Sequence, residues 1–302
     1  MPSTRHTVVG LGELLWDLLP AGKQLGGAPA NFAYITSLLG DTGIPASRLG
    51  QDDLGEEAIR RLGQLGLATD FIQRDTQHST GTVKVEVDRA GQPRFEICEA
   101  VAWDFLKWTS HWQKLASQAD AVCFGSLAQR SAPSRSTIRC FLQATRPGAL
   151  RVFDVNLRQS FYSAEVLSAS MKLATIVKLN HEELPRIMQL FELEHRTEEL
   201  SAQRLVALYN LKLVCITRGN GGSLLANADA CHAHPGFRVK VADTVGAGDA
   251  FTAAMVHEYL RDASLQRMNE AANRIGAWVA SQVGATPGLK PGGLERTLAE
   301  VS

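Results

Sequence analysis

Very little in this sequence would tie the protein to a membrane or to nucleic acid. Apolar runs stay well short of the ~18 uninterrupted residues that a membrane-spanning helix requires. Lys and Arg total 31, as do Asp and Glu, so the formal net charge is zero and the basic excess typical of nucleic-acid-binding chains is absent. The residues before Glu13 lack the pattern of a signal peptide. We therefore expect a cytoplasmic protein with neither a membrane nor a nucleic acid among its partners.

Cysteine is also scarce, and the cysteines form no recognisable motif. The sequence has 5 of them, an odd number, and none stands in a C-x-x-C arrangement. They are Cys98, Cys123, Cys140, Cys215 and Cys231. This scatter is typical of reduced thiols in the cytosol, and it argues against both a disulfide framework and a zinc site.

Apolar residues, by contrast, are plentiful. Hydrophobic residues make up 45% of the 302 positions and charged residues 21%, which is enough for a large core. No repeat, low-complexity tract or linker divides the chain, so residues 1–302 are treated as one domain. Short apolar runs, each followed by a longer amphipathic segment, recur at Thr7–Gly12, Ala46–Gly50, Ala119–Gly125, Leu150–Asp154, Ile176–Asn180 and Leu211–Thr217. This alternation predicts an α/β fold, with a parallel sheet covered by helices on both faces.

One region breaks the alternation of strands and helices. Thr82–Asp88 has apolar and charged residues in turn, and after the turn Ala90–Gln92 the same pattern returns in Arg94–Cys98. The pattern predicts an antiparallel hairpin with one solvent-facing side. Such a hairpin either covers a ligand cleft or is an edge hairpin of the sheet without a functional role.

The segment DTVGAGDAF, residues 243–251, is the most informative one, and it precedes a predicted helix at Thr252–Leu260. Gly246, Ala247 and Gly248 are small, so their backbone N–H groups can meet an anion such as phosphate at the positive end of the helix. A carboxylate in that place, Asp249, fits a base that takes a proton from a hydroxyl attacking phosphorus. The alternative is a glycine-rich turn in which Asp249 caps the helix.

A second small-residue segment, GGAPAN at residues 26–31, opens the predicted helix Ala30–Gly40. Its glycines allow close approach of a ligand, and Asn31 offers both a donor and an acceptor. Asp17 follows the first strand. A carboxylate and an amide together can hold vicinal hydroxyls, although Asn31 could instead be a helix cap and Asp17 a solvated loop acid.

Taken together, GGAPAN and DTVGAGDAF resemble the two signature motifs of the ribokinase/PfkB family of carbohydrate kinases in type, order and spacing. The segments GELLWD, FEICEAVAWDF and FDVNLRQ resemble the fructokinase-like branch. The resemblance covers essentially the whole chain. It implies a ribokinase-like three-layer α/β/α sandwich with a mostly parallel central sheet. It also implies a small β-sheet lid formed by residues near 13–27 and 78–102.

The resemblance assigns roles to individual residues. Asp249 matches the catalytic base, and Gly246, Ala247 and Gly248 match the anion hole. The positions matching sugar contacts are Asp17, Gly26, Gly27, Asn31 and Arg158. Arg158 follows the strand Leu150–Asp154, and strand carboxyl ends line the crevice of an open α/β sheet. Arg158 could hold either a phosphate oxygen or a sugar hydroxyl there, and the alternative is an ordinary surface ion pair.

The resemblance also implies ATP and Mg²⁺ as cofactors. Asn180 and Glu183 match an N-x-x-E element that organises the magnesium–phosphate shell through water, whereas Glu183 could equally be a plain helix-face acid. Positions matching nucleotide contacts are Thr217, Gly219, Gly222 and Asn273. The loops with Asp243 and Val245, and with Gly284 and Ala285, resemble those that bind a monovalent cation, K⁺, through backbone oxygens.

The substrate is inferred from one departure. Relatives that phosphorylate the sugar acid 2-keto-3-deoxygluconate carry an arginine in the lid, where this chain has Ile97-Cys98-Glu99. An added carboxylate there favours a neutral hexose, and we expect phosphorylation of fructose to fructose 6-phosphate. The alternatives are a kinase of ribose, a nucleoside, tagatose 6-phosphate or 2-keto-3-deoxygluconate, and a non-catalytic sugar-binding regulator. The apolar lid face also predicts a homodimer formed through the lid.

Overall fold

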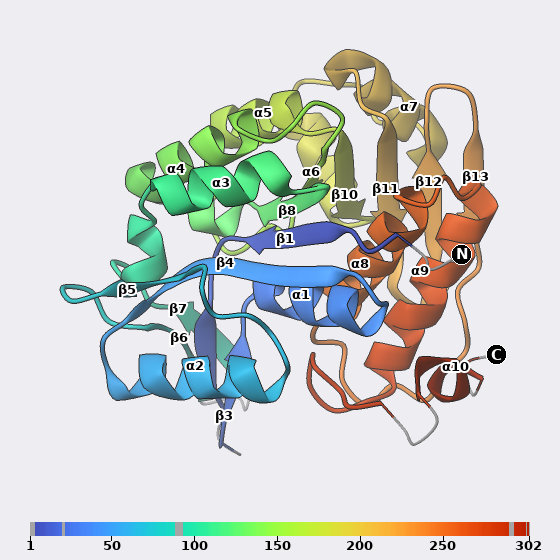
Figure 1. The fold of residues 1–302 in the computed structure, drawn as a ribbon. Coiled ribbons are helices and arrows are strands. Elements are labelled where there is room, and N and C mark those ends of the chain that lie inside the picture. Colours follow the sequence, from blue (N-terminus) through green and yellow to red (C-terminus); the bar gives the residue numbers. More distant parts are fainter. Residues whose placement is uncertain (1–3, 20–21, 88–92, 290–292, 300, 302) are drawn as a thin grey trace.

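The computed structural model describes residues 4–19, 22–87, 93–289, 293–299 and 301, and Figure 1 shows its fold. Over these residues the central sheet has nine strands in the order β13-β12-β11-β10-β9-β8-β1-β4-β5. The parallel strands are β1 (Thr7–Leu11), β4 (Thr42–Gly50), β5 (Ile72–Asp75), β8 (Ala121–Gly125), β9 (Leu150–Asp154), β10 (Ile176–Asn180) and β11 (Leu213–Thr217). At one edge, β12 (Ser223–Ala226) and β13 (Cys231–His234) run antiparallel. The predicted mostly parallel sheet is confirmed.

Helices cover both faces of this sheet, which makes the molecule a three-layer α/β/α sandwich (Figure 1). One face carries α1 (Ala28–Leu38), α2 (Asp53–Gln64), α8 (Ala247–Tyr259), α9 (Leu265–Ala280) and α10 (Gly293–Leu298). The other carries α3 (Ser110–Gln118), α4 (Ala132–Gln143), α5 (Ala164–Leu173), α6 (Glu183–Leu190) and α7 (Glu198–Tyr209). Successive residues of β1 point into opposite cores, Val8 into the first and Val9 into the second. Burial on both faces explains why these strands are apolar throughout.

A second, smaller sheet stands apart from the central one. Its strands β2 (Leu15–Leu19), β3 (Gly22–Gly26), β6 (Gly81–Val87) and β7 (Pro93–Ile97) have the order β3-β2-β6-β7. The β6–β7 pair is the predicted hairpin, and β2 adds to it in parallel. This small sheet is the one that the resemblance leads us to expect. Within the expected lid ranges, residues 20–21 and 88–92, including the predicted turn, lie outside the described residues.

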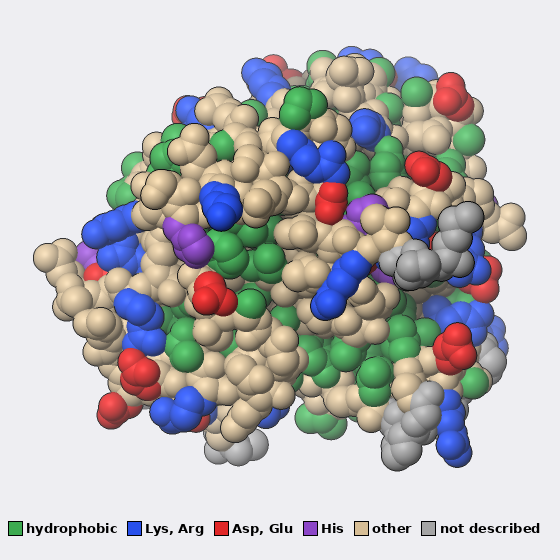
Figure 2. Space-filling view, viewed as in Figure 1, with side chains coloured by type: hydrophobic (Ala, Val, Ile, Leu, Met, Phe, Trp, Pro, Cys, Tyr) green, Lys and Arg blue, Asp and Glu red, His purple; other side chains and the backbone are tan. Residues whose placement is uncertain are grey.

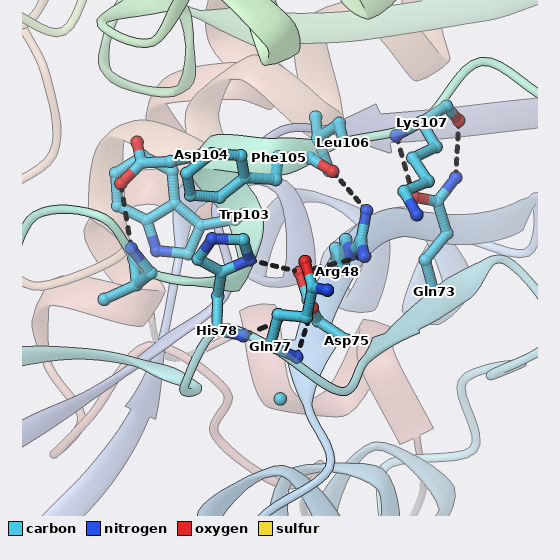
Figure 3. Close-up of polar contacts among 12 residues, drawn as sticks. Arg48, Gln73, Asp75, Gln77, His78, Trp103, Asp104, Phe105, Leu106 and Lys107 are labelled. Atoms are coloured by element: carbon cyan, nitrogen blue, oxygen red, sulfur yellow. Dashed lines mark hydrogen bonds and ion pairs between the residues drawn. The ribbon is translucent and has the colours of Figure 1, made fainter.

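A buried polar cluster ties the chain on either side of the β6–β7 hairpin to the central sheet (Figure 3). Arg48 in β4 forms an ion pair with Asp75 at the end of β5, with 2.9 Å between Nη2 and Oδ2. Asp75 also contacts Nδ1 of His78 at 3.0 Å. The ring of His78 stacks on that of Phe105 at 3.6 Å, and Arg48 donates to the Phe105 carbonyl. The small sheet is therefore attached to the central one at both of its flanks.

Two predicted helix starts are wrong. The helix predicted at Ala30 begins at Ala28, because Gly27 is its N-cap and Pro29 fits the first turn. The helix predicted at Thr252 begins at Ala247, with Gly246 as its N-cap. The residues GAGD resemble a loop by composition, yet small residues fit a first helical turn that packs closely against its neighbours. Asn31 and Asp249 accordingly lie within helices and cap neither of them.

On the face shown in Figure 2, Lys and Arg side chains are interspersed with Asp and Glu side chains, as on an ordinary solvated surface. Within the described ranges, no helix combines the length and the apolar character that crossing a membrane would take.

Candidate active site

The polar residues singled out from the sequence converge at the carboxyl ends of the central strands, where α1 and α8 begin. A small pocket there is lined by Gly125 at the end of β8, Asp154 at the end of β9, and Asn156. Pro29 of α1 and Asp249 of α8 are also among the residues that line it. Open α/β sheets bind their ligands at this edge.

The two signature segments meet directly in this pocket. Nδ2 of Asn31 donates to Oδ2 of Asp249 at 2.9 Å, although the two residues are 218 positions apart. Both side chains come from the first turns of neighbouring helices, which pack against each other. The hydrogen bond holds one oxygen of Asp249 and leaves the other oxygen to face a ligand.

The environment of Asp249 adjusts its acidity. Burial raises its pKa to about 6, and the negative charge of Asp154 adds to the rise. The hydrogen bond from Asn31 and the positive charges of Lys178 and Arg158 act in the opposite direction. A carboxylate with a pKa just below neutrality is ionised at pH 7 and can still accept a proton efficiently.

The turn before Asp249 has the geometry of an anion site. Gly246 has φ 77° and no side-chain cap, so the first N–H groups of α8 point out of the helix. A Cβ on Gly246 would lie 2.4 Å from that of Ala285, and one on Gly248 would lie 3.2 Å from Nζ of Lys178. Gly246 is thus required by its close neighbour and its positive φ, whereas a Cβ on Gly248 would be a tight contact that displaces Lys178 by a few tenths of an ångström. Gly246 and Gly248 present backbone N–H groups beside the carboxylate, while the N–H of Ala247 between them donates to the Thr244 carbonyl at 3.3 Å.

Two charged residues missed in the sequence lie beside this turn. Lys178 of β10 and Asp154 of β9 are register partners, and Nζ lies 3.1 Å from each carboxylate oxygen of Asp154. The two side chains are only 8% and 6% exposed. Burial would lower the pKa of Lys178, but Asp154 and Glu183 outweigh it and raise the pKa above its usual value. The signal in the sequence was a Lys in the middle of one strand and an Asp at the end of another, both strands being expected to be buried.

Asn180 and Glu183 hold two loops of the site in place. Oε1 of Glu183 accepts from the N–H of Leu157 at 2.7 Å, and Oε2 accepts from that of Asn180 at 2.8 Å. Oδ1 of Asn180 in turn accepts from the N–H groups of Glu182 and Glu183. Burial raises the pKa of Glu183, while Lys178 opposes the rise. Because backbone donors occupy both oxygens, Glu183 fits a metal held through water better than direct ligation.

No set of three or more His, Cys, Asp or Glu side chains suited to a metal ion occurs among the residues that the structure describes. Phosphate oxygens, water and one or two carboxylates are the ligands typical of Mg²⁺ in phosphoryl-transfer sites.

Asp17, Gly26 and Arg158 lie on the side of the small sheet. Asp17 pairs in register with Gln24, and a Cβ on Gly26 would lie 2.4 Å from its Oδ2. Burial raises the pKa of Asp17, and the positive charge of Arg158 counteracts the rise. Arg158 itself is exposed and donates to the Leu157 carbonyl. Its charge also acts on Asp249, so the structure brings the expected sugar-side residues together.

Glu13 is a further acid that sequence reasoning missed. It is 4% exposed, and its Oε2 has no hydrogen-bond partner within the described part of the chain. Burial raises its pKa to about 7. Asp249 raises it further, whereas its own N–H and Arg158 lower it. A cue was present in the sequence, since Glu13 directly follows the first buried strand.

The expected nucleotide residues lie at the end of β11 and beyond. Thr217 is the register partner of Asn180, so the loops after β10 and β11 are adjacent. Gly219–Gly221 form a short 3₁₀ turn, η3. Gly222, at φ 79°, packs against the His234 carbonyl where no larger residue would fit.

Asn273 is tied to the central sheet. It is buried in α9, and its Nδ2 donates to Oγ of Ser223 at 2.7 Å. The amide therefore fixes α9 against β12, on the side of the molecule where the expected nucleotide turn lies.

Asp243 connects the two loops in which a monovalent cation was expected. Its Oδ1 accepts from the N–H of Val245 at 3.0 Å, and its Oδ2 accepts from that of Gly284 at 3.1 Å. The carboxylate is thus occupied by backbone donors, and the carbonyl groups of both loops are left as ligands.

Known proteins resemble this chain over most of its length. Residues 21–291 match the family described as pfkB family carbohydrate kinase. Among curated relatives, the sugar kinase PH1459 of Pyrococcus horikoshii is 31% identical over 92% of this chain and 91% of that protein. The fructokinase of Escherichia coli is 28% identical over 92% and 94%, respectively.

Solved structures agree in fold. That of PH1459 in complex with ATP has a TM-score of 0.78 at 30% identity and covers 92% of this chain and 94% of its own. A double mutant of the Vibrio cholerae O395 fructokinase, solved with fructose, ADP and potassium ion bound, has a TM-score of 0.82 at 24% identity and covers 100% of both chains.

Proposed function

Because the chain belongs to the pfkB family of carbohydrate kinases, we propose that it transfers the γ-phosphate of ATP to fructose, forming fructose 6-phosphate. The observation that carries the proposal is the hydrogen bond from Asn31 to Asp249, which joins both signature segments at the anion turn of α8. Fructokinases among the relatives and the ATP complex of PH1459 support this choice of donor and acceptor.

The transfer proceeds as an in-line displacement. The oxygen of the primary hydroxyl bonds to the γ-phosphorus while the bond from that phosphorus to the β–γ bridging oxygen breaks. The electron pair of the broken bond leaves with ADP, and the hydroxyl proton passes to Asp249. Since the transition state of such reactions is loose, proton transfer comes late, and positioning supplies much of the acceleration.

Each group of the site has a separate task in this scheme. Asn31 orients Asp249, and Asp17 with Arg158 holds the sugar hydroxyls so that the reacting one faces the base. The N–H groups from Gly246 to Gly248 stabilise negative charge on the phosphate oxygens, where preorganised donors act most strongly. Gly26 and Gly27 let the sugar approach the backbone.

Metal ions would assist the proposed phosphoryl transfer through their positive charge. Magnesium, when bound, would supply positive charge that offsets the charge of the phosphate groups. Asn180 and Glu183 would hold its hydration shell. A potassium ion would bind backbone carbonyls of the loops joined by Asp243, which include Val245. Thr217, Gly219, Gly222 and Asn273 form the nucleotide side of the proposed site.

A neutral sugar is favoured by the charges under the small sheet. The segment Ile97-Cys98-Glu99 holds no cation, and the nearby Arg130 is paired with Asp104 through two hydrogen bonds of 2.8 Å. Nη2 of Arg130 also donates to the Cys98 carbonyl. Because Asp104 balances the charge of Arg130, this segment adds no free positive charge for a sugar carboxylate to that of the exposed Arg158, as far as the described residues show.

The expected homodimer stays a prediction. Of the alternate apolar residues behind it, Val83 and Ile97 are buried within the chain itself. Light scattering during size-exclusion chromatography would measure the mass in solution.

The decisive experiment is an ADP-release assay with Mg-ATP and a panel of acceptors, with Asp249→Asn as the blank. The panel holds fructose, glucose, ribose, adenosine, tagatose 6-phosphate and 2-keto-3-deoxygluconate. Turnover highest on fructose supports the proposal. Preference for the sugar acid or another acceptor overturns the substrate and retains the chemistry. ATP binding with no turnover on any acceptor would favour a sugar-binding regulator.

A further inference from the structure

Lys178 occupies a position that a stabilising ion pair alone would not require. Its ammonium group lies on the α8 face of the sheet, next to Gly248, the last residue of the anion turn. The distance from Nζ to the position of a Gly248 Cβ is only 3.2 Å, so even one added methyl group would press on it. An anion held by the N–H groups of this turn would therefore lie close to the charge of Lys178.

The bonding of Lys178 leaves room for such an anion. An ammonium group has three N–H donors, and two of them face the oxygens of Asp154, each at 3.1 Å. In the described part of the chain, no further acceptor bonds to Nζ. The third donor can serve a phosphate oxygen without breaking the pair with Asp154.

The charges around Lys178 also favour contact between this residue and a phosphate group. Three carboxylates act on Lys178, namely Asp154, Glu183 and Asp249, and Glu13 acts on two of these three. Such a cluster would repel the phosphate groups of a nucleotide. Lys178 is the buried cation within it, whereas Arg158 is exposed at its rim. A charge kept away from water acts with much greater strength on a nearby anion.

Stability by itself accounts poorly for this pair. Replacing a buried ion pair by neutral groups of similar size is often neutral or even stabilising, since both charges lose their hydration. A buried lysine beside an anion turn is better explained by a ligand that it meets during the reaction.

We propose that Lys178 is a catalytic residue whose ammonium group contacts the transferred phosphoryl group, and that Asp154 is the positioning residue that holds it there. The proposal rests on the proposed kinase function and adds a residue to it. As the bond to the γ-phosphorus breaks, negative charge spreads over the phosphoryl oxygens and the departing bridge oxygen. Lys178 contributes a fixed positive charge at that point, with no cost of reorganisation.

The test compares the affinity for a nucleotide that has a γ-phosphate with the affinity for one that lacks it. AMPPNP and ADP are titrated calorimetrically, both with Mg²⁺ and without sugar, into the wild type, Lys178→Met, Lys178→Arg and the double variant Lys178→Met/Asp154→Asn. We expect Lys178→Met to reduce the ratio of AMPPNP to ADP affinity at least 10-fold and to lower kcat by ~10²–10³-fold. Lys178→Arg should recover part of both, because it keeps the charge.

The double variant addresses folding. Lys178→Met alone leaves Asp154 buried without a partner, which destabilises the protein, whereas the double variant buries no unpaired charge. It should fold and still show the reduced affinity ratio. A double variant with wild-type kcat and affinity ratio would overturn the proposal, because the pair would then be structural.

Arg48→Met is the matched control. Arg48 also forms a buried ion pair, with both partners 5% or less exposed, but it lies among the residues of Figure 3 and away from the anion turn. It should lose thermal stability and keep the ratio of affinities. If Arg48→Met lowered the ratio as much as Lys178→Met, the effect would be general destabilisation and the proposal would be wrong.

The experiment distinguishes a failure of the proposal for Lys178 from a failure of the proposed kinase function. The affinity ratio is measured without any sugar, so it reports on Lys178 whichever acceptor the enzyme uses. A wild type that binds neither nucleotide would overturn the kinase proposal itself. A wild type that phosphorylates a sugar, with a Lys178→Met variant unchanged in ratio and rate, would overturn only the role of Lys178.

Discussion

Asn31 donates a hydrogen bond of 2.9 Å to Asp249, and this bond connects the first turn of α1 with the first turn of α8. It fixes one carboxylate oxygen and lowers the pKa of a group that burial would otherwise make a weaker acid. Position and acidity of the proposed base are therefore both set by a residue from the opposite part of the sequence.

Asp249→Asn should lower kcat by ~10²–10⁴-fold, the usual contribution of a general base. The amide keeps the size of the side chain, so the affinities for ATP and sugar should stay within a few-fold of the wild type. Steady-state kinetics and calorimetry on the same preparation measure both. A variant with nearly full turnover would remove Asp249 from the mechanism.

The rate should depend on pH through the same residue. Asp249 has a pKa of about 6 and must be ionised to accept a proton, so kcat/KM should fall as the pH drops below about 6. Asn31→Asp would put a second carboxylate at hydrogen-bond distance from it and raise its pKa by about one unit or more. The acid limb of the pH profile should then move to higher pH, and an unmoved limb would contradict the prediction.

Glu13 should make the stability of the protein depend on pH. Its pKa is about 7 in the folded state, against an ordinary value of 4.5. The folded state therefore binds more protons, and stability falls as the pH rises from about 4.5 to 7. The total loss is about 3 kcal/mol, at 1.36 kcal/mol per pKa unit.

Glu13→Gln removes this dependence. The variant should match the wild type in chemical denaturation near pH 4.5 and exceed it at pH 8. The exposed Glu165→Gln serves as the control and should show no such divergence. Equal stability of Glu13→Gln and wild type at pH 8 would show that Glu13 is not buried as an anion.

Gly248→Ala tests whether the close contact with Lys178 lowers activity even though alanine favours the helix. Alanine favours a helix over glycine by roughly 1 kcal/mol, but the new Cβ would press on Nζ of Lys178 at 3.2 Å. We expect a folded variant with kcat at least 10-fold lower. Gly63→Ala in α2, where a Cβ meets nothing within 4 Å, should gain stability and keep its activity. Equal activity of both variants would contradict the close fit at the anion turn.

The central sheet could be predicted because its strands are buried on both faces. Runs such as Leu150–Asp154 and Ile176–Asn180 have the bounds expected from their apolar residues alone. The strands β2 and β3 carry no such signal, since Asp17, Lys23 and Gln24 interrupt them. Only the resemblance pointed to a second sheet there.

The candidate site was predictable in its motifs and not in its buried charges. Asp249 and Asn31 stand in segments whose small residues make them conspicuous. Lys178 lies in an apolar run and Glu13 directly follows one, which hints at their burial, but the sequence does not show which charges they meet. Their surroundings depend on the register of β9 with β10 and on the packing of α8, which arise only when distant segments meet.

The interior position of β1 in the sheet means that its neighbouring strands are made at different times during synthesis. This first strand lies between β4 and β8, so one of its neighbours is made only after residue 121. The helix that carries Asp249 follows much later in the chain. On the ribosome, the early segments must wait without their partners, and no nascent fragment that ends before α8 holds the proposed base. Contacts so distant in sequence close slowly, so the site around the proposed base can form only after α8 has been made.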